Sequence, residues 1–209
     1  TGGTTAGNGA LLLDAGSPTN TDGALTAAGT AATVVRVAGA FDNTRGALAT
    51  AGGLTVHAGE LTNVDGTIQS ASEDGMTVTA DGRLVNDGGS IEGNGAIALN
   101  AQSMTNADGV VQTQKAITAT VADTLDNSGG TFASGDALTL KVGTLRNLDT
   151  FDGGATDPSA QKGLFGRQVA IEAATLDNTR GQIQAGEAAD LTGTNLSNAG
   201  GLIGGVGAV

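Results

Sequence analysis

Apolar and polar residues alternate in short stretches that recur along the chain. Examples are Leu54-x-Val56-x-Ala58, Met76-x-Val78-x-Ala80, Ile97-x-Leu99-x-Ala101 and Leu138-x-Leu140-x-Val142. Alternation with a period of two predicts β-strands that bury one face. Threonine is frequent between the apolar residues, and it suits the exposed face of a strand. Helices are disfavoured because glycine is dense and apolar residues form no stripe at helical spacing.

An asparagine recurs at nearly constant spacing, with steps of 20 to 23 residues and one step of 31. The positions are Asn20, Asn43, Asn63, Asn86, Asn106, Asn127, Asn147, Asn178 and Asn198. This spacing indicates that the whole chain is one array of repeats. A unit of about 20 residues is too short to close its own core, so each unit must stack on its neighbours.

Fixed positions around each asparagine carry fixed residue types. An apolar residue comes two positions before it in eight repeats, glycine three positions after it, and another apolar residue five positions after it. Glycine and asparagine tolerate positive φ, so the Asn-x-x-Gly segment predicts a tight corner between strands. The Asn147 repeat departs from the pattern, because Thr150 and Asp152 occupy the glycine position and the second apolar position.

These patterns predict a right-handed parallel β-helix of about nine turns, or rungs, of 20–23 residues each. Residues 1–209 form a single domain, and stacked asparagines can hydrogen-bond from rung to rung as a structural ladder. Thr1 begins in mid-pattern and the last rung stops in mid-pattern, so we expect a fragment of a longer filament. We expect a monomeric rod about 45 Å long, from a spacing of roughly 4.8 Å per rung.

Composition narrows the partners that this chain can have. Its 21 acidic and 9 basic residues give a net charge of −12, which argues against nucleic acid, anionic membranes and heparin-like glycans. Cysteine is absent, so disulfides and thiolate metal sites are excluded. No apolar run of about 18 residues is present, so no helix inserts into a membrane.

The long step between Asn147 and Asn178 predicts a loop insertion at residues 148–168. Insertions in solenoids map to loops on one face, which is often the binding face. The insertion holds the candidate recognition residues Phe151, Asp152, Asp157, Lys162, Phe165 and Arg167. The alternative is that its two phenylalanines fold back over the rod and cover the altered rung. The two aspartates match no standard calcium loop.

Other candidate chemistry is sparse, and we expect no cofactor, no metal and no enzymatic activity. His57, the single histidine, points outward and has no set of convergent ligands around it in the sequence pattern. Asp42, Asp126 and Asp177 share one corner position, so they could pair as in β-helix enzymes that act on polysaccharides. Their recurrence with the repeat favours a turn preference instead.

The phrases Phe41-Asp42-Asn43-Thr44-Arg45-Gly46, Leu125-Asp126-Asn127-Ser128-Gly129-Gly130 and Leu176-Asp177-Asn178-Thr179-Arg180-Gly181 carry a family likeness. Together with strand phrases such as Ala137-Leu138-Thr139-Leu140, they resemble the haemagglutinin repeats of filamentous haemagglutinin and of contact-dependent growth inhibition effectors. The resemblance covers about residues 10–203.

The resemblance implies a large adhesin or toxin-delivery protein of a two-partner (type V) secretion system in a Gram-negative bacterium. Such proteins cross the outer membrane unfolded through a dedicated transporter, fold outside, and stay secreted or at the cell surface, where they serve cell adhesion and virulence. The repeats would form the shaft that extends a distal binding or toxin-delivery element. The alternative is an adhesive module that binds a receptor or glycan on a target cell through residues 148–168.

Overall fold

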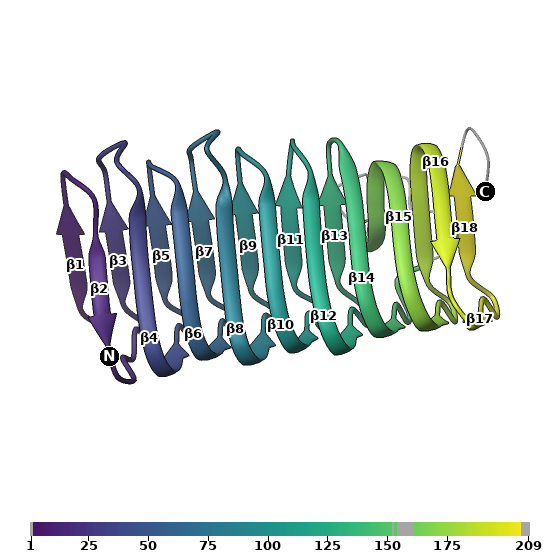
Figure 1. Ribbon diagram of the computed structural model, residues 1–209, viewed down its shortest axis with the longest axis horizontal. Coiled ribbons are helices and arrows are strands. Elements are labelled where there is room, and N and C mark those ends of the chain that lie inside the picture. Colours follow the sequence, from purple (N-terminus) through teal and green to yellow (C-terminus); the bar gives the residue numbers. More distant parts are fainter. Residues whose placement is uncertain (1, 152, 154–160, 206–209) are drawn as a thin grey trace.

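The computed structural model describes residues 2–151, 153 and 161–205, and every regular element in that part of the chain is a β-strand. Strands that pair are parallel and come from successive turns of one coil (Figure 1). The coil has about nine turns, and this confirms the predicted parallel β-helix. Among the described residues, no helix is long and apolar enough to cross a membrane.

Each rung contains a short strand and a long strand, which lie on different sides of the coil (Figure 1). The short strands have four residues each and are β1 (Thr4–Gly7), β3 (Ala24–Ala27), β5 (Ala47–Thr50), β7 (Thr67–Ser70), β9 (Ser90–Gly93), β11 (Val110–Thr113), β13 (Thr131–Ser134) and β18 (Leu202–Gly205). The strands on the other side are β2 (Leu12–Ala15), β4 (Thr33–Asp42), β6 (Leu54–Thr62), β8 (Met76–Val85), β10 (Ile97–Thr105), β12 (Ile117–Asp126), β14 (Ala137–Arg146) and β17 (Asn195–Ser197). Two strands, β15 (Gly163–Asp177) and β16 (Gln182–Thr192), extend over both sides.

Most long strands bend near their middle, where the pairing register shifts. In β6 the shift lies between Ala58 and Leu61, and Gly59 occupies the bend. A Cβ atom at Gly59 would lie 2.9 Å from the carbonyl oxygen of Ala38 in the preceding rung. The bend carries the strand from one side of the coil to the next. Glycine fits this corner because successive rungs lie close together there.

The core consists of columns of equivalent apolar residues, one from each rung. Leu48, Ile68 and Ile91 pair in register across the short strands, and each is fully buried. The long strands add columns such as Val56, Val78 and Leu99, along with the residue two positions before each asparagine from Asn43 to Asn178. Burying a side chain of this size contributes about 1.5–3 kcal/mol relative to leaving it exposed. Aliphatic columns thus fill most of the core, and Phe41 and Phe132 are its two buried phenylalanines among the described residues.

The extra residues between Asn147 and Asn178 leave the coil and return to it within one rung. Gly163 pairs with Thr131, and Leu164 pairs with both Phe132 and Ile183, so β15 begins inside the segment that the sequence predicts as a loop. Leu164 is fully buried and continues the apolar column, although Asp152 occupies the corresponding position when residues are counted from Asn147. Relative to the other rungs, the added chain is residues 151–162, and residues 163–168 belong to the strand.

Candidate functional site

The nine recurring asparagines stack into one column of side-chain hydrogen bonds. Each Nδ2 donates to the Oδ1 of the asparagine in the next rung, at distances of 2.6–2.9 Å, from Asn20 through to Asn198. The column continues across the insertion, because Asn147 donates to Asn178 at 2.7 Å. The seven asparagines from Asn43 to Asn178 are completely buried, so these bonds form away from solvent.

The same amides also satisfy the backbone of the corner. Asn86 Nδ2 donates to the carbonyl oxygen of Gly89 at 3.2 Å and to that of Val110 in the next rung at 3.2 Å. The Gly89 N–H in turn donates to the Asn86 carbonyl at 3.1 Å, which closes a four-residue turn. Each asparagine thus supplies the donors that a buried corner needs.

Geometry at the corner explains the two residue types that follow each asparagine. The second residue after it has positive φ in rung after rung, including φ values of 51° at Arg45 and 52° at Asp108. The glycine at the third position lies against the preceding rung. A Cβ atom on Gly89 would overlap the Asn63 carbonyl oxygen and would come within 2.9 Å of the Asn63 amide nitrogen. Glycine is required there for space between rungs rather than for a positive φ.

Thr150 replaces the corner glycine at the rung that carries the insertion. It is buried, and its hydroxyl oxygen accepts a hydrogen bond of 2.8 Å from the Gln182 N–H. In other rungs that N–H donates to the carbonyl oxygen of the corner glycine, as Thr67 does to Gly46. A side-chain acceptor therefore takes over from a backbone acceptor where the chain leaves the coil.

The two cations predicted as recognition residues both pair with carboxylates of the shaft. Lys162 Nζ lies 2.7 Å from Asp108 Oδ1, and Arg167 lies 2.6 Å from Asp136 and 3.6 Å from Glu187. The hydrogen bond from Arg167 to Asp136 raises the pKa of the guanidinium. These pairs are about half exposed, so solvent weakens them, but they place the returning end of the insertion against the rod.

The aromatic candidates lie on either side of the insertion: Phe151 is the first residue of the added chain, and Phe165 lies beyond it in β15. Phe151 follows Thr150, is half-buried, and donates its N–H to the Arg180 carbonyl at 2.9 Å. Phe165 is also half-buried and points outward from β15, because its neighbour Leu164 points into the core. Asp152 and Asp157 lie outside the described residues. The structure thus places Lys162, Phe165 and Arg167 on the rod surface at the start of β15.

Carboxylates at the corner position are held by turn hydrogen bonds. Asp42 Oδ1 accepts from the Thr44 N–H at 2.9 Å and from the Thr44 hydroxyl at 2.6 Å, while Oδ2 accepts from Thr21. The hydrogen bond from the Thr44 hydroxyl is the largest cause of a lowered pKa at Asp42. Asp126 and Asp177 accept equivalent bonds from the second residue after them. The predicted turn preference accounts for these three residues without a catalytic pair.

The single histidine also has a surface partner. His57 Nε2 lies 2.9 Å from Asp81 Oδ1, and both side chains are more than half exposed. No cluster of three or more metal-ligating side chains occurs within the ranges that the structure describes.

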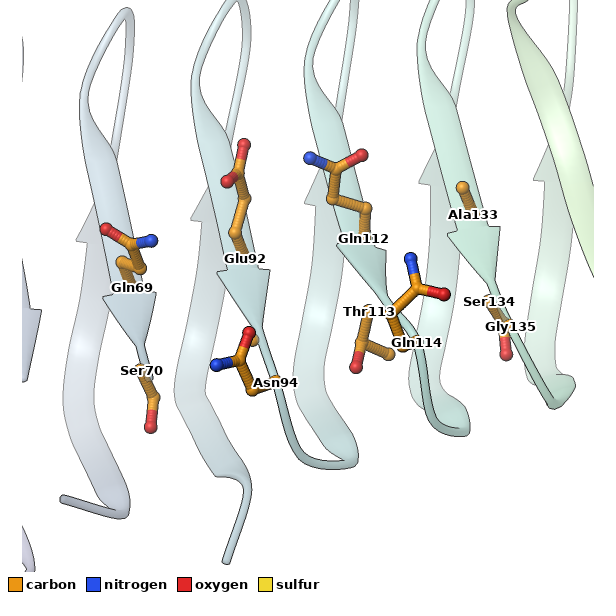
Figure 2. Close-up of a pocket in the computed structure, with 11 residues that line it drawn as sticks. Gln69, Ser70, Glu92, Asn94, Gln112, Thr113, Gln114, Ala133, Ser134 and Gly135 are labelled. Carbon is orange, nitrogen blue, oxygen red and sulfur yellow. The ribbon is translucent and has the colours of Figure 1, made fainter. Parts of the chain in front are cut away.

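The outer face of the short strands contains two hollows that sequence reasoning missed. One hollow of about 370 Å³ lies over β7, β9, β11 and β13, with Gln69, Glu92 and Gln112 standing on three neighbouring strands (Figure 2). A second, of about 560 Å³, is lined by Thr131, Gln161 and Phe165 and shares Glu92, Gln112 and Ala133 with the first. Six residues after successive asparagines, the outward position carries Gln69, Glu92, Gln112 and Ala133, so no shared residue type marks this face in the sequence.

Comparison with known families decides what kind of repeat this is. The haemagglutinin repeat model matches residues 1–44, 30–88, 77–129, 90–157 and 164–209, which together span nearly the whole chain. The chain belongs to the haemagglutinin repeat family. This confirms the resemblance of the corner phrases. Comparison with curated proteins and with solved structures finds no match.

Membership explains the regularity of the ladder. In this haemagglutinin repeat array, corner asparagine, corner glycine and core columns recur because every rung meets the same two neighbours. The family is one of structural adhesins, and the buried ladder is the feature that a structural rod requires.

Proposed function

We propose that these haemagglutinin repeats form part of the shaft of a secreted, cell-surface filamentous exoprotein of a Gram-negative bacterium. The shaft holds a distal binding or toxin-delivery element away from the cell that makes it. The observation that carries this proposal is continuity: the asparagine ladder and the apolar columns pass through the insertion without a break. A continuous buried ladder resists bending at any one rung, and resistance to bending is what an extending rod needs.

The export route follows from the family and the composition. An outer-membrane transporter of a two-partner secretion system would pass the chain unfolded, and a chain without cysteine cannot form disulfides that block such passage. Rungs that fold outside the cell could draw the rest of the chain outward. Export of the Asn86→Ala variant, measured as protein reaching the medium, tests this point, and export equal to that of the unaltered protein would count against it.

A second candidate function is adhesion through the insertion, the alternative that the sequence leaves open. The observation in its favour is Phe165, which borders an open hollow on the rod surface. A polysaccharide-cleaving β-helix is less favoured, because the corner carboxylates are engaged in turn hydrogen bonds.

Cell binding by the purified chain separates the shaft from the adhesive module. Labelled protein is applied to bacterial and epithelial cells, beside a variant in which residues 151–162 are removed so that Thr150 joins Gly163. Circular dichroism verifies that both proteins fold. The shaft proposal predicts no binding by either protein. Binding that is lost only in the trimmed variant would overturn it in favour of adhesion through the insertion.

A further inference from the structure

The hollows over the short strands form one continuous surface groove. The first crosses β7, β9, β11 and β13, and the second continues to Phe165 at the start of β15. The two share Glu92, Gln112 and Ala133, so the groove runs along the rod axis and crosses successive rungs (Figures 1 and 2). Small side chains make this room, since Gly93, Ala133 and Gly135 lie where longer residues would fill it.

Side chains along the groove present free amide groups to solvent. Gln69, Gln112 and Gln114 are exposed, and their amides have no hydrogen-bond partner among the described residues. Figure 2 shows their amide groups at the surface of the hollow. By contrast, the hydroxyls of Thr113 and Ser134 donate to backbone carbonyls inside the turns, at 2.7 and 2.8 Å. The groove therefore offers amide donors and acceptors that the protein itself does not use.

We propose that this groove binds an extended, uncharged glycan that lies along the rod axis. Each amide carries a carbonyl acceptor beside an NH₂ donor, and neighbouring sugar hydroxyls present the complementary pair. Rungs repeat at roughly 4.8 Å, which is close to the length of one pyranose unit in an extended chain. Gln69, Glu92 and Gln112, on three consecutive rungs, would thus meet three consecutive sugar units.

Charge selects the class of glycan. Glu92 is the ionisable residue that lines both hollows, and its Oε1 already accepts a hydrogen bond from the Ser90 hydroxyl at 2.5 Å. Its second oxygen remains an acceptor for a sugar hydroxyl. A sulfated or uronic glycan would meet this carboxylate and the net charge of −12, and both repel anions.

Phe165 provides an apolar surface at one end of the groove. Its ring is half-buried beside Ala133, and the C–H face of a pyranose can pack against such a ring. A protein partner would require several apolar or aromatic anchors at the centre of the interface. The groove provides one aromatic ring and a row of amides, which favours a hydroxyl-rich ligand. The inference goes beyond the shaft function, because it assigns a ligand to the side of the rod.

Affinity electrophoresis of the whole chain tests this proposal. Native gels contain hydroxyethyl cellulose, glycol chitin, galactomannan or, as the charged comparison, polygalacturonate. The variants are Gln112→Ala and Phe165→Ala in the groove and Gln102→Ala as a matched control, because Gln102 is exposed but does not line the groove. Circular dichroism verifies that each variant folds, as expected for outward positions.

We expect at least one uncharged polysaccharide to retard the chain. Each groove variant should bind about tenfold more weakly, the factor that corresponds to loss of roughly one favourable contact, while Gln102→Ala binds normally. Three results would overturn the proposal: no retardation by any uncharged polysaccharide, equal retardation of the groove variants, or retardation by polygalacturonate alone.

Discussion

Replacing Asn86 with alanine removes the middle of the asparagine ladder. The change deletes the hydrogen bond that Asn86 accepts from Asn63 and the one that it donates to Asn106, both 2.7 Å long. The Oδ1 atom of Asn106 then stays completely buried without its donor. The substitution also removes the longer bonds from Asn86 to the carbonyl oxygens of Gly89 and Val110. Together with the unsatisfied Asn106 acceptor, these losses should lower the free energy of unfolding by about 3–5 kcal/mol. Asn63 Nδ2 is affected less, because it keeps two carbonyl acceptors.

Urea unfolding followed by circular dichroism measures this loss. Stacked repeats can unfold in parts, so the midpoint should be compared together with hydrogen exchange of amides in the rungs beside Asn86. The matched control is Asn100→Ala, because Asn100 lies on the outer face and its side-chain hydrogen bond to Thr79 is long, at 3.5 Å. That control should change the stability by no more than about 0.5 kcal/mol. Equal effects of the two substitutions would refute the structural importance of the ladder.

Three further predictions concern the corner, its charge and the added chain. Gly89→Ala should destabilise the rod by about 1–3 kcal/mol or more, because the new methyl group overlaps the preceding rung. Gly204→Ala should leave the stability unchanged, because the space around Gly204 is open. Thermal melting compares the two variants. Lowering the pH should destabilise the protein through Asp42, because the folded pKa is depressed below 3.8 by the Thr44 hydrogen bond. The stability that ionised Asp42 contributes is present above the pKa of the unfolded state and is lost as the pH falls through the pKa of the folded state. Melting temperatures of the Asp42→Asn variant should therefore fall less in acid than those of the wild type. Removal of residues 151–162 should leave the strand signal in the far-ultraviolet circular dichroism spectrum of the rod unchanged, because the chain leaves and re-enters the coil at adjacent positions of one rung. A loss of strand signal would contradict this.

Much of the fold is readable from the sequence because each rung repeats the same physical solution. The stretches of alternating apolar and polar residues indicate which face of each strand is buried. The regular spacing of the asparagines indicates the register between one rung and the next. Leu48 and Ile68 occupy equivalent sequence positions, and the structure pairs them directly. In this fold, residues at equivalent positions of successive repeats become neighbours in space, so the local sequence pattern also predicts the long-range contacts. That is uncommon in folds without repeats.

The insertion shows where that agreement ends. The apolar column continues at Leu164 after a gap, and counting forward from Asn147 reaches Asp152 instead. Counting back from Val169 comes closer but still misses, because Leu164 lies five residues before Val169 whereas its partner Phe132 lies six before Leu138. The ion pairs of Lys162 and Arg167 could not be anticipated, since they depend on how the added chain returns to the rod.

The groove was also outside the reach of pattern reasoning. Its residues stand at outward positions, where the repeat imposes no constraint on residue type, so nothing in the periodicity marks Gln69 or Gln112 as different from other surface residues. The room between them depends on glycine and alanine in three different rungs.

The most direct test of the shaft is the length of the filament on the cell surface. Five complete rungs, residues 43–146, begin and end at equivalent ladder positions, so extra copies of this block can be inserted without a change of register. Two extra copies should lengthen the filament by about 48 Å, at roughly 4.8 Å per rung. Electron cryotomography of the exported protein measures that length directly. An increase of this size is the result that the account predicts, and a filament of unchanged length would contradict it.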